Sequence, residues 1–350
     1  MSFAWQYYLI TILVYLGVNL IAVWALNLQF GYGGVLNFAF VMFQAFGAYI
    51  AAVLSLGPSS ASGGYQHYVL GARLPWPLPL FCACLAGGAL AVIVGLFALR
   101  PARRDFQAVV MLAISLIAYQ VVGSQARLFN GAAGVAGVPK PLLGGLGLLT
   151  WGWLYVGIVG VFCAAVYACI HNVTGSPWGR RLRAMRDNPA AARALGTDVR
   201  REALTVYALG GALSALSGGL LVEFIGTWAP GSWSTGETFV YFVALVVGGL
   251  GNNFGAFVGT ALVLGVFTEG VRFLPNLALG SNGDAVQALA ISLLILVVLW
   301  VRPNGLIPER RRRLAPHGRQ RQDVPPAAAT NSGRPAAPLT TAFPQVVDNG

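Results

Sequence analysis

The chain has 350 residues, of which 57% are hydrophobic and 9% are charged, with a formal net charge of +11. Many apolar segments approach the roughly 20 residues that an α-helix needs to cross the hydrocarbon core of a bilayer. The sequence therefore predicts an all-α polytopic membrane protein and excludes a transmembrane β-barrel, whose short strands alternate in polarity. The positive charge does not indicate nucleic-acid binding, because the basic residues are confined to a few segments between or after the apolar ones.

Breaker residues divide the apolar segments into about nine predicted transmembrane helices, within a range of eight to ten. In chain order they cover residues 5–27, 33–56, 78–99, 105–124, 151–170, 202–224, 238–251, 254–274 and 286–301. The first is expected to be a transmembrane segment, because it lacks the basic start of a cleaved signal peptide. QFGYGG near its end can interrupt a helix, and GGLGNNFG leaves a very short turn between the seventh and eighth helices.

The arginines predict the topology. Three lie in RPARR at 100–104, seven between His171 and Arg201, and eight from Arg302 onward. Basic loops face the cytoplasm, so these segments and the C-terminus are expected there, which leaves the N-terminus extracytoplasmic. We therefore expect a multi-pass protein of a bacterial inner membrane, with a transmembrane domain at 1–307 that includes a cytoplasmic loop at 171–201. A basic, Pro/Ala-rich tail at 308–350 is expected to be disordered.

The cytoplasmic loop contains two helix start signals, Ser176-Pro177 and Asn188-Pro189. In each, a small polar side chain can cap free amides and the proline suits the first helical position. We predict helices at about 177–187 and 189–195, the second ending at Gly196 in a left-handed turn. The first helix could lie along the membrane surface. The second is mostly alanine and suits a groove on another protein, although an ordinary interfacial helix is the alternative.

Five motifs resemble known sequences. PAAARALG is similar to the EAA loop of bacterial ABC importer permeases, with Ala190 in place of Glu. More broadly, SPWGRRLRAMRDNPAAARALGTDVRR, GYGGVLNFAFVMFQAFGAY, NGAAGVAGVPKP, VVGGLGNNFGAFVG and RPNGL resemble signatures of the permeases of branched-chain amino-acid ABC transporters. They cover residues 30–307 in the family's order, and the two proline-rich matches favour the member of the permease pair called M.

The resemblance implies an importer of branched-chain or other apolar amino acids. It implies as partners a second, paralogous permease, two cytoplasmic ATPases and an extracytoplasmic solute-binding protein. The residues implied to contact the ATPase are Arg186, Asp187, Asn188, Pro189, Ala191, Ala192, Leu195 and Gly196. A P-loop needs lysine followed by Ser or Thr, whereas the single lysine, Lys140, precedes Pro141. The chain is thus expected to be a transport subunit and no enzyme, with ATP-Mg bound by its partners.

The sequence also offers candidate path residues and alternative functions. Polar Asn37, Gln44, Gln120 and Glu223 lie within or near the spans and are candidates for the translocation path. A permease for urea or short amides, an ion-coupled secondary carrier and a non-transporting scaffold are the alternative functions. Neither a metal site nor a bound cofactor is expected, because the four cysteines lie inside apolar segments and the three histidines are scattered.

Overall fold

The computed structural model describes residues 3–59, 66–99 and 104–270, followed by 289, 292, 293, 296, 297, 300–302 and 305–309. All of them belong to one unit, Met1–Arg310. Only scattered residues of the predicted helix at 286–301 are described, and nearly all of the predicted tail lies outside the described residues, so both stay predictions.

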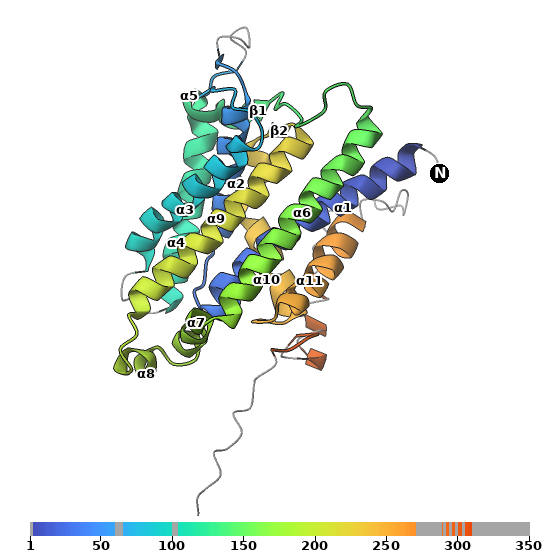
Figure 1. The fold of residues 1–350 in the computed structure, drawn as a ribbon. Helices are drawn as coiled ribbons and strands as arrows, with labels where there is room; N and C mark the ends of the chain where they lie inside the picture. Colours follow the sequence, from blue (N-terminus) through green and yellow to red (C-terminus); the bar gives the residue numbers. More distant parts are fainter. Residues whose placement is uncertain are drawn as a thin grey trace, which may run out of the picture. The chain divides into compact units, whose positions relative to one another are not determined.

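The described part is a bundle of α-helices (Figure 1). Its principal elements are α1 (Phe3–Leu26), which continues into the π-helix η1 (Asn27–Tyr32), α2 (Phe40–Ser55), α3 (Leu78–Ala98), α4 (Arg104–Ser124), α6 (Leu148–Gly175), α9 (Val199–Ile225), α10 (Thr235–Gly248), α11 (Asn253–Thr260) and the π-helix η5 (Ala261–Gly270). Five segments of the described residues are long and apolar enough to span a bilayer: Trp5–Tyr32, Leu78–Ala98, Phe106–Ser124, Leu148–Gly175 and Val199–Ile225. The polytopic helical class is confirmed; the count of nine stays a prediction.

Helix α9 forms the centre of the bundle and packs against α1, α2 and α3. Small residues permit this contact, because hydrophobicity cannot drive helix association inside a membrane. A Cβ atom on Gly218 or Gly47 would collide with backbone atoms of the facing helix, and one on Gly211 would stand 2.5 Å from Cβ of Ala91. The glycines of α9 therefore serve close packing within this chain.

Three predicted boundaries differ from the structure by five residues or more. The second helix begins at Phe40 instead of residue 33, and the first continues through η1 to Tyr32. Between them Gly34 takes a φ of +67°, and the side chain of Asn37 accepts a hydrogen bond from Ala39 N at 3.0 Å. These local interactions replace the helix over the predicted first turns. Helix α6 continues to Gly175, because nothing before Ser176 ends it.

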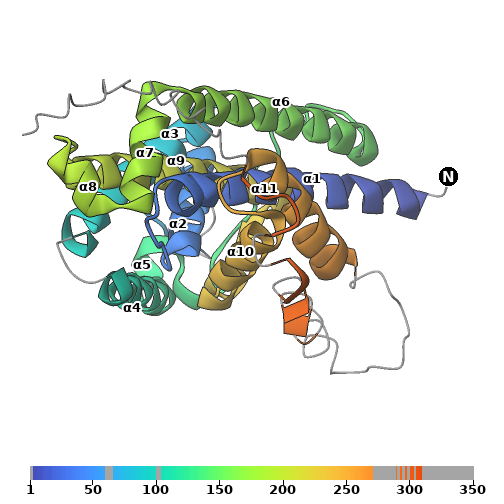
Figure 2. The same ribbon diagram turned by 90° about the horizontal axis from the view of Figure 1, so that it is seen from below.

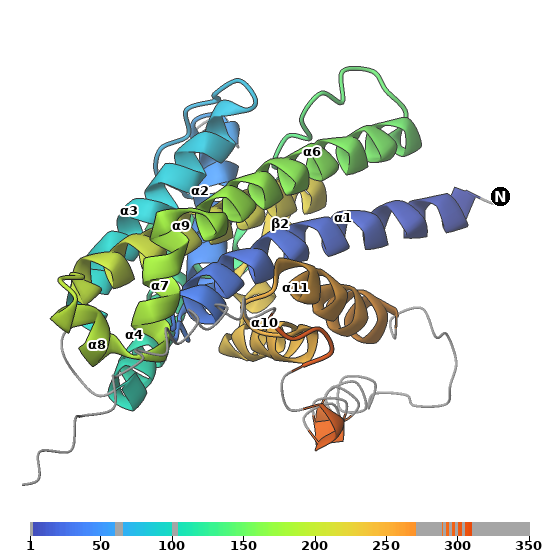
Figure 3. The ribbon, with the colours of Figure 1, turned by 60° about the horizontal axis from the view of Figure 1, so that its bottom comes forward.

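The two ends of the bundle carry different connecting elements. The connecting elements at one end are α5 (Ala126–Phe129) and the 3₁₀ turns η3 (Gly131–Ala133) and η4 (Pro230–Ser232). The same end carries an antiparallel pair of two-residue strands, β1 (Val135–Ala136) and β2 (Thr227–Trp228). At the other end lie α7 (Pro177–Asp187) and α8 (Pro189–Ala194) (Figures 1 and 3). The sequence reading missed the strand pair, which is too short to produce an alternating pattern.

Candidate functional site

Helices α7 and α8 begin as their start signals predict. The Ser176 hydroxyl accepts hydrogen bonds from Trp178 N and Gly179 N at 3.2 and 3.3 Å, and the Asn188 side chain accepts two from the first turn of α8 at 3.1 Å. Prolines occupy the first position of both helices. Gly196 takes a φ of +84° directly after α8. The two-helix prediction is thus confirmed, with α8 one residue shorter than expected.

Helix α7 is anchored on the end of the bundle. Leu182 and Met185 are buried, and Gly179 lies so close to Thr174 that a Cβ would collide with its backbone. The Trp178 indole donates a hydrogen bond to Glu202 of α9. The apolar face of α7 therefore packs against protein and does not lie on the membrane surface. Figure 2 views this end of the bundle, with α7 and α8 beside the end of α9.

Helix α8 separates the predicted contact residues into two groups. Ala192 faces the bundle and is 3% exposed, whereas Ala191 and Asn188 are exposed and Leu195 is 85% exposed. Together with the exposed alanines beside it, this leucine makes a small apolar surface at the end of the bundle. Ala190, Ala191, Ala194 and Leu195, which we call the α8 surface, form this outward face.

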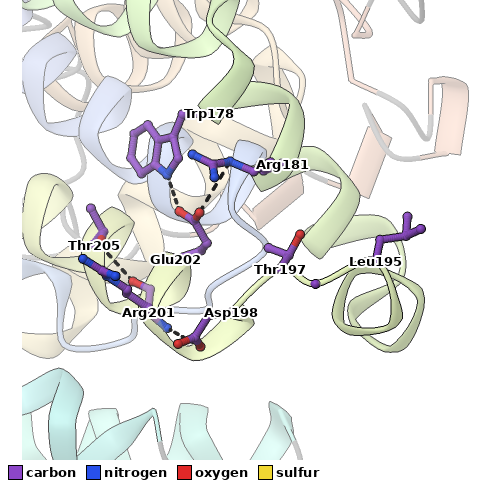
Figure 4. Close-up of a pocket in the computed structure, with 9 residues that line it drawn as sticks. Trp178, Arg181, Leu195, Thr197, Asp198, Arg201, Glu202 and Thr205 are labelled. Carbon is purple, nitrogen blue, oxygen red and sulfur yellow. Dashed lines mark hydrogen bonds and ion pairs between the residues drawn. The ribbon is translucent and has the colours of Figure 1, made fainter.

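A pocket of about 540 Å³ opens beside the α8 surface (Figure 4). The pocket is lined by Trp178, Arg181, Leu195, Gly196, Thr197, Asp198, Arg201, Glu202 and Thr205. Arg181 pairs with Glu202 at 3.5 Å, and Asp198 caps α9 by accepting from Arg200 N and Arg201 N. The lining carries two arginines and two acids, so the pocket is polar without a net charge.

Arg186, predicted as an ATPase contact, points into the bundle. Its guanidinium donates to the Gly31 carbonyl, to Glu309 Oε2 at 2.8 Å and to Asp187 Oδ1 at 3.0 Å. Arg183, one turn away, lies 3.2 Å from Glu309 Oε1. Burial alone would lower the pKa of Arg186, but the hydrogen bonds and charges of Glu309 and Asp187 outweigh it and raise the pKa above its usual value. Arg186 therefore remains a cation in this setting.

Glu309 was missed by sequence reasoning. It follows the RPNGL motif, 123 positions after Arg186, and sequence spacing carries no information about such a contact. The only signal was its place as the lone acid beside four arginines, Arg310 to Arg313.

The candidates for a translocation path do not lie together. Asn37 and Gln44 are buried in separate hydrogen-bond networks: Asn37 donates to Gln29 at 2.9 Å, and Gln44 donates to Ser217 at 3.1 Å. Gln120 is exposed on α4. Glu223 is 1% exposed, and its Oε2 has no hydrogen-bond partner among the described residues. A role in the path stays a prediction for each of them.

The described part is thus a polytopic helical bundle with two capped helices, α7 and α8, at one end. The family model of the permease component of branched-chain amino acid transport systems matches residues 8–299. The chain therefore belongs to this family.

Curated relatives agree with the family match. The chain is 25% identical over 322 residues to the probable branched-chain amino acid transport permease protein LivM of Methanocaldococcus jannaschii, covering 85% of this chain and 93% of the relative. It is 26% identical to the high-affinity LivM permease of Escherichia coli, covering 87% and 69%. The probable LivH permease of M. jannaschii is 27% identical, covering 78% and 90%. No solved structure matches the chain.

Proposed function

We propose that the chain is the transmembrane subunit of an ABC importer that moves branched-chain or other apolar amino acids across the inner membrane. The observation that carries this proposal is the α8 surface, in which an 85% exposed leucine ends an alanine helix at one end of a permease bundle. Partner ATPases would cover this surface. The chain pairs with a second, paralogous permease and receives solute from an extracytoplasmic binding protein. The LivM and LivH relatives support the pairing.

Energy comes from ATP and Mg²⁺ bound by the two cytoplasmic ATPases. A closing ATPase pushes on the α8 surface and, because α8 connects directly to the 27-residue α9, the displacement enters the centre of the bundle. The chain itself supplies no catalytic group to hydrolysis. Its work is mechanical, and selection of the solute belongs largely to the binding protein. The alternative is that the chain is a permease for urea or short amides.

Reconstitution tests the proposal against an ion-coupled carrier. We expect uptake of leucine, isoleucine or valine into liposomes only when the chain is combined with its permease partner, ATPases, binding protein and ATP. The measurement is radiolabelled solute uptake, with a non-hydrolysable ATP analogue as the control. Uptake by this chain alone, driven by a proton or sodium gradient, would contradict the proposal.

The orientation of the chain is a separate prediction. Reporter fusions after Arg201 are expected to be active on the cytoplasmic side, and fusions near Gly134 on the external side. The support is that Gly134 lies against β2, at the end of the bundle away from α7 and α8 (Figure 1). Alkaline phosphatase and fluorescent-protein fusions at both positions provide the measurement. Phosphatase activity after Arg201 would reverse the proposed topology.

A further inference from the structure

We infer that Arg186 is a positioning residue that couples the cytoplasmic helices to two breaks in the transmembrane helices, and does not itself contact the ATPase. This inference rests on the proposed function. We call the arrangement the Arg186 joint: the guanidinium of Arg186, the carboxylate of Glu309 and the three glycines around them, Gly31, Gly34 and Gly251.

Two of the three glycines, Gly34 and Gly251, make room for the Arg186 side chain. A Cβ on Gly34 would stand 2.9 Å from Arg186 Cγ, and one on Gly251 would stand 3.0 Å from Arg186 Nη1 and 2.9 Å from Glu309 Oε2. Gly31 contributes the carbonyl that accepts from Arg186 Nη1. A larger residue at Gly34 or Gly251 would press on the arginine, whereas one at Gly31 would collide with Asn27 Oδ1 and Gly251 N. Four of the sequence motifs therefore meet at one side chain: GYGG, RAMRDN, GGLGNN and the segment that follows RPNGL.

Glu309 is tied to the turn between α10 and α11. Leu306 N and Ile307 N donate to the carbonyls of Val247 and Gly248 at 2.9 and 3.0 Å. The side chain of Asn252 donates to the Ile307 carbonyl at 3.3 Å. Because these hydrogen bonds hold the backbone before Glu309, a movement of the Glu309 carboxylate would displace the α10–α11 turn as well.

The same turn is bonded to the break in the first helix. Gly251 N donates to Asn27 Oδ1 at 3.0 Å, and Asn27 Nδ2 donates to Asn253 Oδ1 at 3.1 Å, all at buried positions. Asn27 begins the π-helix η1, which ends at Tyr32. The ring of Tyr32 lies 5.2 Å below the guanidinium of Arg183. Through Arg183 and Arg186, helix α7 thus contacts η1 directly and the α10–α11 turn by way of Glu309.

The chemistry of the joint suits transmission of a movement. Hydrogen bonds between a guanidinium and a carboxylate are charge-assisted, and the planar guanidinium holds several acceptors in fixed directions. The Arg186 side chain is 20% exposed, as is that of Glu309, so water weakens the pair less than it would on an open surface. π-helical segments are frequent at functional sites, and a displaced α7 would bend the chain at such a break before it moved a continuous helix.

The test uses the complete importer in liposomes. The variants are Arg186→Gln and Glu309→Gln, singly and combined, with Arg186→Lys as a milder change that keeps the charge. Arg180→Gln is the matched control, because Arg180 is exposed on the same helix and the same charge is lost. Three quantities are measured for each variant: ATPase co-purification, solute-stimulated ATP hydrolysis and solute taken up per ATP.

We expect Arg186→Gln and Glu309→Gln each to lower uptake per ATP about tenfold, because each removes charge-assisted hydrogen bonds of the joint. ATPase co-purification should stay at the wild-type level. The double variant should be no worse than Arg186→Gln, since both changes break one interaction. Arg186→Lys should fall in between, and Arg180→Gln should match the wild type. If Arg186→Gln does not assemble, Glu309→Gln and Arg186→Lys carry the test.

Two results would overturn the joint. One is wild-type uptake per ATP in Glu309→Gln; the other is loss of ATPase binding in Arg186→Gln alone, which would make Arg186 an ATPase contact. Additive losses in the double variant would also argue against it. Failure of the proposed function is distinct, because it would appear as absence of ATP-driven uptake by the wild-type complex.

Discussion

Replacing Leu195 with aspartate is expected to abolish most solute uptake while the permease still folds and inserts. The side chain is 85% exposed, so the isolated chain loses little from the change. In the assembled importer the leucine would be buried by an ATPase, and burial of such a side chain contributes about 1.5–3 kcal/mol. A carboxylate placed there also loses its hydration without a partner. We therefore expect both ATPase co-purification and uptake to fall at least about tenfold.

The matched control is Asn172→Asp. It adds the same negative charge at an exposed position near the same end of the protein, on α6 and away from α8. Wild-type uptake by Leu195→Asp, or an equal loss in Asn172→Asp, would show that the α8 surface is not where an ATPase binds. Ala192 is unsuitable for this test, because it packs inward and a charge there would disturb the fold.

Gly218→Val is expected to prevent formation of the bundle. The Cβ of any side chain at this position would overlap the carbonyl of Gln44 in α2, and backbone atoms cannot move aside as a flexible side chain can. Overpacking of a core commonly costs about 1–3 kcal/mol, and this contact leaves no side chain to relax. Since stabilities of about 5–15 kcal/mol are typical, the yield and the thermal stability of the purified protein should fall sharply.

Gly160→Val is the control for this effect. Gly160 is also a helical glycine, on α6, and a Cβ there would meet no atom within 4 Å. The two variants thus share the chemical change and differ only in the space around it. Size-exclusion chromatography in detergent and a thermal melt measure the outcome. Similar behaviour of both variants would mean that α2 and α9 do not approach as closely as the structure has them.

Local signals in the sequence predicted the bounds of α7 and α8 well. Ser176 and Asn188 each offer a side-chain acceptor to the amides that follow within three residues, so the information needed to start α7 and α8 lies within the segment itself. The same holds for Gly196, whose left-handed conformation suits glycine. By contrast, the start of α2 was placed seven residues early, because the apolar run from Gly33 conceals a turn held by Asn37.

The direction in which side chains point required the tertiary structure. The resemblance assigned Arg186 and Ala192 to a contact with the ATPase, and the structure adds that Arg186 donates to the Gly31 carbonyl and that Ala192 is buried. Helical periodicity alone does not say which face a short amphipathic helix presents to its own protein. The contact that orients Arg186 comes from Glu309, far away in the chain.

The sequence by itself determined that this is a helical membrane protein of the branched-chain permease family with a capped pair of short helices, α7 and α8. Hydropathy, arginine placement and capping are properties of single segments, and the lipid solvent allows them few alternative structures. Only the tertiary structure decided that GYGG, RAMRDN, GGLGNN and Glu309 meet around one guanidinium. The physical reason is that hydrogen bonds and close glycine contacts form between segments that the folded bundle alone brings together.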